Sequence, residues 1–270
     1  MPQKLGQHFL KNKSVIPKII AALELKAGET VIEIGPGEGA LTIPLADACK
    51  LAGCKLIAIE RDRALAQDLE SRIKNYGGII KIIEGDALEV LPSLIHDSLF
   101  IPHGFKLVGN IPYYITGHLL RVIGEMENKP ATSVLMIQKE VAERISAEPP
   151  KMNLLAAATQ IWAEAEIIAG LKPKDFDPPP KVDSAVIKLT TINQSLVVSR
   201  KSLVDYYRLI KLIFKQPRKT ALNNLSDGLQ ITKNEAVELI KSVGLPENSR
   251  PQNFSLEQLI ELSTTTHKYR

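Results

Sequence analysis

The chain carries near its N-terminus the stretch Thr30-Val31-Ile32-Glu33-Ile34-Gly35-Pro36-Gly37-Glu38-Gly39-Ala40, in which apolar residues lead into three closely spaced glycines. The β-branched residues predict a buried strand, and the glycines permit a tight turn whose backbone approaches a ligand closely. Gly35-x-Gly37-x-x-Ala40 also satisfies the dinucleotide fingerprint in its Gly/Ala form. The stretch therefore predicts a cofactor-binding turn after the first strand of an open sheet, with a dinucleotide as one alternative.

Similar apolar runs follow at regular intervals. We expect strands at 55–60, 79–84, 105–110, 133–137 and 183–189, with helices between the first of them at 41–48 and 64–74. Continuous apolar strands alternating with helices are typical of a parallel sheet that is buried on both faces. The sequence therefore predicts an α/β fold with a mostly parallel sheet flanked by helices.

The pattern changes beyond about residue 195. Short amphipathic helices are expected at 202–214, 219–225, 233–243 and 255–261, without strands between them. We expect Gln216-Pro217 to break the helix that begins near Ser202, because proline lacks the backbone N–H that a helix interior needs. The prediction is a first domain over residues 1–194, including an N-terminal arm at 1–23, and a small all-α domain over 195–270.

The charge of the chain is unevenly distributed. The net charge is +4 over 270 residues, but residues 1–190 carry a net −1 and residues 191–270 a net +5. The arm at 1–23 is also basic and free of acidic residues. Residues 206–226 contain five basic residues and no acid: Arg208, Lys211, Lys215, Arg218 and Lys219. Spacings of three or four place the first four of these partly on one helix face. Two basic segments beside a neutral body favour a nucleic-acid partner, and solvated surfaces are the alternative.

Composition excludes several classes of protein. Hydrophobic residues make up 44% and charged residues 24%, which is typical of a globular chain. No apolar run approaches the ~18 residues of a membrane span, and no apolar signal core follows Met1. Cys49 and Cys54 match no zinc spacing and form no disulfide framework. We therefore expect a cytoplasmic protein that has no metal and does not bind membranes.

Acidic residues stand at the ends of the next two strands. Glu60 ends the run at 55–60, and Asp86 follows the run at 79–84 in Gly85-Asp86-Ala87. A carboxylate at the first position can accept both ribose hydroxyls, and one at the second can accept an adenine amine. Together with the glycine turn, these positions resemble a class I methyltransferase dependent on S-adenosylmethionine. Helix capping by the two residues is the structural alternative.

The tetrapeptide Asn110-Ile111-Pro112-Tyr113 ends the fourth strand. It resembles the Asn/Asp-x-Pro-Tyr/Phe motif of methyltransferases that act on exocyclic amines. An adenine amine is a weak nucleophile because its lone pair is delocalised into the ring. Two acceptors, the Asn110 side-chain carbonyl and the Ile111 backbone carbonyl, can hold its N–H groups so that the lone pair faces the methyl donor, while Tyr113 stacks on the extruded base.

Seven motifs occur in an order that resembles the ribosomal RNA small-subunit adenine dimethyltransferase family, the KsgA type. Besides those above they include Gly6-Gln7-His8-Phe9-Leu10, Gln138-Lys139-Glu140-Val141 and the run from Phe176 to Val186. The resemblance covers residues 3 to about 260. It implies an enzyme that converts two adjacent adenosines near the 3′ end of small-subunit rRNA to N6,N6-dimethyladenosine, acting as a monomer on an assembling subunit.

The resemblance also implies roles for individual residues. Glu60 would hold the cofactor ribose and Asp86 the cofactor adenine, and Phe176 would stack on the target base opposite Tyr113. The implied cofactor pocket comprises His8, Leu10, Gly35, Glu60, Asp86 and Asn110. The implied catalytic set comprises Asn110, Ile111, Pro112, Tyr113 and Phe176. The five basic residues at 208–219 would contact rRNA phosphates.

Some positions depart from the family pattern, and two other functions stay open. Relatives often carry Asn at His8, Tyr-Gly-Arg-Leu where Lys151-Met152-Asn153-Leu154 stands, and further arginines at Pro217 and Ala221. The missing arginines concern the details of RNA binding and not the chemistry. One alternative is a large-subunit rRNA methyltransferase of the macrolide-resistance type. The other is a non-catalytic RNA-binding assembly factor.

Overall fold

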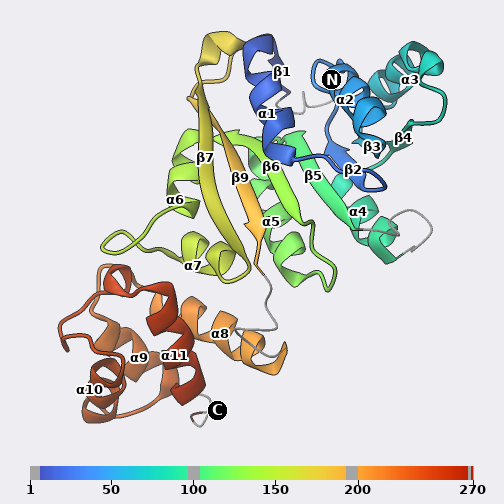
Figure 1. Cartoon of the computed structure of the whole chain (residues 1–270). Helices are drawn as coiled ribbons and strands as arrows, with labels where there is room; N and C mark the ends of the chain where they lie inside the picture. Colours follow the sequence, from blue (N-terminus) through green and yellow to red (C-terminus); the bar gives the residue numbers. More distant parts are fainter. Residues whose placement is uncertain (1–6, 97–103, 193–199, 267–268, 270) are drawn as a thin grey trace. The chain divides into compact units, whose positions relative to one another are not determined.

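The computed structural model describes residues 7–96, 104–192, 200–266 and 269 (Figure 1). The chain divides into two compact units, one of residues 1–142 with 164–191 and one of residues 143–163 with 192–270. Residues 143–163 thus group with the C-terminal helices, whereas the sequence placed them in the first domain. The boundary at residue 194 stays a prediction.

The first unit is built on a seven-stranded sheet in the order β4-β3-β2-β5-β6-β9-β7. Strands β4, β3, β2, β5 and β6 run parallel, and β9 pairs antiparallel with β6. The strands are β2 Thr30–Ile34, β3 Lys55–Glu60, β4 Ile80–Glu84, β5 Phe105–Asn110, β6 Thr132–Gln138, β7 Ala163–Leu171 and β9 Ser184–Thr191. The prediction of a mostly parallel sheet is confirmed.

Helices flank this sheet (Figure 1). They are α1 Ile16–Leu23, α2 Thr42–Ala52, α3 Arg63–Arg72, α4 Ala87–His96, α5 Thr116–Glu125 and α6 Lys139–Ile145. All five residues of β2 are buried, as expected for a strand with helices on both sides of its sheet. The core includes Leu56 of β3 and Val108 of β5, both packed beneath these helices.

The register of the parallel strands gathers their carboxyl ends at one edge. Ile34 pairs with Ile59 of β3 and with Gly109 of β5, and Glu60 pairs with Glu84 of β4. A two-stranded antiparallel sheet joins β1, Phe9–Leu10, to β8, Phe176–Asp177. The residues that follow β2, β3, β4 and β5 therefore meet at one site, which is where open α/β sheets bind ligands.

The second unit is helical. Its helices are α7 Leu154–Gln160, α8 Arg200–Ile213, α9 Ala221–Leu229, α10 Lys233–Ser242 and α11 Leu256–Thr266. Tyr206 of α8 is fully buried and donates a hydrogen bond from its hydroxyl to the Ala157 carbonyl, 2.9 Å away, which ties α8 to α7. No helix in the described parts of the chain is long and apolar enough to cross a membrane.

One expectation for this unit is wrong. The basic residues do not share one helix face, because α8 ends at Ile213 and Lys215, Arg218 and Lys219 lie in the turn before α9. The cause is Pro217, whose ring would clash with the carbonyl of the residue four positions earlier, Ile213, and which cannot donate a hydrogen bond to it. The expected helix break at Gln216-Pro217 is therefore present. The helix already ends at Ile213, about one turn before Pro217.

Candidate active site

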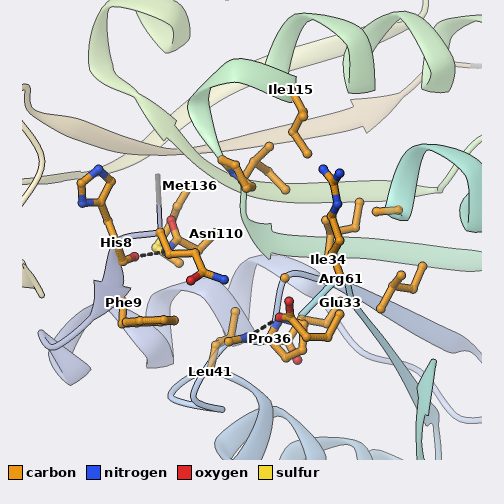
Figure 2. Close-up of a pocket in the computed structure, with 18 of the residues that line it drawn as sticks. His8, Phe9, Glu33, Ile34, Pro36, Leu41, Arg61, Asn110, Ile115 and Met136 are labelled. Atoms are coloured by element: carbon orange, nitrogen blue, oxygen red, sulfur yellow. Dashed lines mark hydrogen bonds between the residues drawn. The ribbon is translucent and has the colours of Figure 1, made fainter. Parts of the chain in front are cut away.

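A pocket opens at the carboxyl edge of the sheet in the first unit (Figure 2). Its walls come from β1, from the glycine turn after β2, from the end of β3, and from the turns after β4 and β5. The predicted residues that line it are His8, Leu10, Gly35, Glu60, Asp86, Asn110, Ile111, Pro112 and Tyr113. The structure thus brings together all but one of the residues proposed for the cofactor and the chemistry.

The glycine turn forms a cradle that side chains would fill. Gly35 and Gly37 have φ angles of +67° and +54°, a conformation that favours glycine. A Cβ on Gly37 would lie 2.9 Å from the ring of Phe9, which covers the turn from β1. A Cβ on Gly35 would meet only the Asn110 carbonyl oxygen, at 3.7 Å. The Gly35 backbone is therefore open to a ligand, while the absence of a side chain at Gly37 leaves room for the Phe9 ring.

Glu60 is a buried carboxylate at the end of β3. Its Oε2 accepts the Gly37 N–H at 3.0 Å and its Oε1 accepts the Asp62 N–H at 2.9 Å. An ionised carboxylate has about four acceptor positions, so each oxygen keeps one for a further donor. Two hydroxyls of a ribose match this remaining capacity, and the backbone contacts fix the orientation in which the carboxylate offers it.

Asp86 has two roles in the structure. Its Oδ1 accepts the Leu88 N–H at 3.0 Å, which caps the N-terminus of α4. Its Oδ2 lies 3.4 Å from a guanidinium nitrogen of Arg61, a partly exposed pair that contributes little to stability. The structural alternative of helix capping is thus present at Asp86, together with its place in the pocket wall. Arg61 also lines the pocket, and the sequence did not identify it.

Asn110 is oriented by the N-terminal arm. Its Nδ2 donates a hydrogen bond to the His8 backbone carbonyl at 2.7 Å, and the two residues lie side by side in the pocket (Figure 2). The Ile111 N–H donates to the Met136 carbonyl of β6 at 3.0 Å. Neither contact uses the Asn110 Oδ1 or the Ile111 carbonyl, which can both accept hydrogen bonds, and both residues line the pocket.

Tyr113 is held by two contacts. Its hydroxyl lies 2.7 Å from the Ser184 hydroxyl of β9, and its ring centroid lies 5.8 Å from that of His8. His8 is in turn fixed by its Nδ1, 2.7 Å from the Pro178 carbonyl. A ring fixed in this way offers a preorganised face to a planar ligand.

Phe176 does not reach the pocket. Its side chain is 3% exposed and packs in the core, while β8 pairs its backbone with Leu10. It belongs to the buried apolar cluster that also contains Val15 and Leu171. Phe176 therefore pairs with the arm through its backbone, and stacking of its ring on a base opposite Tyr113 stays a prediction.

Glu33 lies beneath the glycine turn, inside β2. Burial raises the pKa of Glu33 to about 8; the neighbouring Thr42 hydroxyl opposes the rise and the nearby Glu60 carboxylate adds to it. Its Oε2 is buried and has no hydrogen-bond partner among the described residues, and Glu33 is one of the residues that line the pocket. An unpartnered buried carboxyl oxygen beside a glycine turn fits a ligand that carries hydrogen-bonding groups, as the amine and hydroxyl groups of S-adenosylmethionine do.

The sheet order, the glycine turn and the acidic strand ends define a class I methyltransferase. Two solved structures share the fold over nearly the whole chain. A dimethyladenosine transferase from Plasmodium falciparum aligns with a TM-score of 0.81 at 24% identity, covering 97% of this chain and 98% of that one. The 23S rRNA methyltransferase ErmE aligns with a TM-score of 0.76 at 25% identity, covering 95% and 98%.

Sequence comparison narrows the class to a family. The family model described as ribosomal RNA adenine dimethylase matches residues 2–268. A ribosomal RNA small subunit methyltransferase A from Dehalococcoides mccartyi is 39% identical over 94% of this chain and 84% of its own length. A protein of the same name from Koribacter versatilis is 37% identical over 98% and 94%. The chain belongs to the ribosomal RNA adenine dimethylase family.

Proposed function

We propose that the protein transfers methyl groups from S-adenosylmethionine to two adjacent adenosines near the 3′ end of small-subunit rRNA, giving N6,N6-dimethyladenosine during subunit assembly. The observation that carries the proposal is the placement of Asn110-Ile111-Pro112-Tyr113 in the same pocket as Glu60 and Asp86. An amine-positioning motif beside a nucleoside-binding pair fits methyl transfer to an adenine amine. The small-subunit relatives at 37–39% identity support the choice of rRNA.

Different residues of the pocket fit different groups of the cofactor. The open backbone at Gly35 approaches it, Glu60 accepts its ribose hydroxyls, and Asp86 accepts its adenine amine. When bound, S-adenosylmethionine supplies a methyl group already activated by a positive sulfur. A strong general base is therefore not required of the protein, whose task is to position the nucleophile.

The substrate adenine is positioned by three groups. The Asn110 Oδ1 and the Ile111 carbonyl accept the two N–H bonds of the amine, which favours a pyramidal nitrogen with its lone pair directed along the reaction axis. The Tyr113 ring stacks on the base and fixes its plane. His8 contributes indirectly, because its carbonyl holds the Asn110 amide and its ring braces Tyr113.

The variant Asn110→Ala tests this arrangement. Loss of the Oδ1 acceptor is expected to lower the single-turnover rate of methylation at saturating cofactor by about 100-fold, while cofactor affinity measured by calorimetry falls less. Asn75→Ala makes the same change at an exposed asparagine in the turn after α3, outside the pocket wall, and controls for nonspecific effects on activity. A rate in Asn110→Ala equal to that of the unmodified protein would refute the assigned role.

A large-subunit rRNA target is the second candidate, and the similarity to ErmE over 95% of the chain is the observation that favours it. Transfer of labelled methyl groups to purified unmethylated small and large subunits separates the two, with incorporation expected into the small subunit. Binding to the small subunit without incorporation would instead indicate a non-catalytic assembly factor. We further propose that the protein acts as a monomer in the cytoplasm, where small subunits assemble.

A further inference from the structure

Tyr114 is exposed to solvent, whereas the ring of its neighbour Tyr113 is fixed by contacts. Both line the pocket, but Tyr114 is 61% exposed while the Tyr113 hydroxyl is bonded to Ser184. The difference follows from the backbone, because Tyr113–Ile115 form a 3₁₀ turn in which successive side chains point about 120° apart. One tyrosine therefore faces into the pocket, and the next projects into solvent at its rim.

An exposed stripe runs from Tyr114, in the 3₁₀ turn, along the first turns of α5. Gly117, His118 and Arg121 follow at helical spacing, and all three are exposed. Arg121 donates to the His118 Nε2 at 3.2 Å, since a guanidinium can only donate, and lies 4.0 Å from the Glu125 carboxylate. A Cβ on Gly117 would meet nothing within 4 Å, so the surface between Tyr114 and Arg121 is open. We call Tyr114, Gly117, His118 and Arg121 the rim stripe.

The chemistry of the rim stripe matches a nucleotide. A single exposed aromatic residue is ordinary on a protein surface. Here the ring stands beside the pocket that takes the target base, and a guanidinium lies two helical turns beyond it on the same open surface. A base that stacks on a ring while its phosphate meets a cation is the usual pattern of single-stranded RNA binding.

We infer that the rim stripe binds the nucleotide adjacent to the target adenosine, with its base stacked on Tyr114 and its phosphate near Arg121. The inference rests on the proposed function and extends it from the reacting base to its neighbour. Because the proposed substrate contains two adjacent adenosines, the rim stripe holds one of them while the other occupies the pocket.

Substitutions at Tyr114 test the inference on unmethylated small subunits. Tyr114→Ala is expected to raise the KM for subunits about 5-fold or more, the loss that follows from removing one base–aromatic stack. Tyr114→Phe keeps the ring and is expected to stay within about 2-fold of the unmodified protein. Leu51→Ala removes a side chain that is 91% exposed on α2, outside the pocket wall, and serves as the matched control. Cofactor affinity by calorimetry should be the same in all four proteins.

A second measurement identifies what the rim stripe binds. The probe is a short single-stranded RNA with 2-aminopurine beside the target adenosine, whose fluorescence is quenched on stacking. Quenching is expected with the unmodified protein and with Tyr114→Phe, and its loss is expected with Tyr114→Ala. Arg121→Gln should reduce the slope of log affinity against log salt by about 0.7, the value for one neutralised phosphate on a single strand.

The outcomes separate the inference from the proposed function. An unchanged KM in Tyr114→Ala, with normal methylation by the unmodified protein, would overturn the rim stripe and leave the proposed function intact. A raised KM for subunits without any change in quenching of the RNA probe would overturn it too, because the rim stripe would then contact a ribosomal protein. Absence of methylation by the unmodified protein would reject the proposed function itself.

Discussion

Glu60 joins the two halves of the cofactor site. One of its oxygens holds the glycine turn through Gly37 and the other holds the start of α3 through Asp62. Glu60→Ala is therefore expected to weaken S-adenosylmethionine binding by at least about tenfold, because it removes a charged acceptor for two hydroxyls and releases the turn. Isothermal titration calorimetry measures the change directly.

Two controls keep this result interpretable. Glu84→Gln alters an exposed glutamate at the end of β4, paired with Glu60 in the sheet but outside the pocket wall, and should leave affinity unchanged. The thermal unfolding of Glu60→Ala shows whether the fold persists. A folded variant with unaltered cofactor affinity would contradict the role assigned to Glu60.

Glu33 makes the stability of the ligand-free protein dependent on pH. Its pKa of about 8 in the folded state lies above the ordinary value of 4.5, so the folded protein holds a proton that the unfolded chain releases between those values. The free energy of unfolding should therefore fall as pH rises from about 5 to 8. Glu33→Gln removes this contribution. In urea unfolding, the stability of Glu33→Gln relative to the unmodified protein should therefore increase as the pH rises from about 5 to 8. The control Glu38→Gln, at an exposed site, should show no such increase. If the difference in the free energy of unfolding between Glu33→Gln and the unmodified protein were the same at pH 5 and at pH 8, Glu33 would be ionised in the folded protein.

Pocket residues that belong to a sequence motif were predictable. Contacts between residues that are far apart in the sequence were not. Gly35, Glu60 and Asn110 stand at strand ends, so their convergence follows from the parallel sheet. The packing of the Phe9 ring against Gly37 joins residues 28 positions apart, and no local sequence pattern predicts this contact. The burial of Phe176 was also not predictable, because an aromatic residue beside a proline run looks the same in sequence whether it faces a ligand or the core.

At the scale of elements, the contact between β2 and β5 sets the position of the tetrapeptide that we propose for the chemistry, Asn110-Ile111-Pro112-Tyr113. A Cβ on Gly109 would lie against the carbonyl oxygen of Ile34, so the close approach of these strands requires glycine there. Gly109→Ala is expected to destabilise the protein by about 1–3 kcal/mol and to shift Asn110, which follows it. Chemical denaturation gives the first effect and the methylation rate gives the second.

Gly170→Ala is the matched control for that substitution. It lies in β7, and a Cβ there meets nothing within 4 Å. Its stability should stay within about 0.5 kcal/mol of the unmodified protein. Equal effects of the two substitutions would mean that the β2–β5 contact is not specially tight.

The elements that the sequence identified are those with a continuous apolar pattern. Strands β2 to β6 and β9 occur where they were expected, because buried parallel strands are apolar throughout. Strand β7, Ala163–Leu171, was missed: only its two end residues are buried, and its charged and small residues give no alternation. Strands β1 and β8 have two residues each, which is too short for any periodicity.

At the scale of the whole molecule, the excess positive charge and the candidate active site lie in different parts of the sequence. The pocket lies in the first unit, while all five residues of the predicted basic segment are exposed in the second unit. Lys219 lies 3.9 Å from Asp227, an exposed pair that leaves it available to a stronger partner. Although α8 and the following turn divide the segment, its exposure still fits contact with rRNA phosphates.

Neutralising Lys211, Lys215 and Arg218 together should weaken binding to small subunits and leave cofactor affinity intact. The slope of log affinity against log salt should fall by about 0.7–0.9 for each phosphate that the variant no longer neutralises. Changing Lys233 and Lys241 of α10 to glutamine tests whether any exposed lysine of this unit has the same effect. Equal slopes in the triple variant and the unmodified protein would assign the segment to solvation.

Nucleoside mass spectrometry of small-subunit rRNA tests the central claim most directly. Unmethylated small subunits are incubated with the protein and isotopically labelled S-adenosylmethionine, and the rRNA is digested and analysed. The account predicts labelled N6,N6-dimethyladenosine, which RNase fragments locate at two adjacent positions near the 3′ end, and formation about 100-fold slower with Asn110→Ala. Label found only in large-subunit rRNA, or no dimethyladenosine with the unmodified protein, would contradict it.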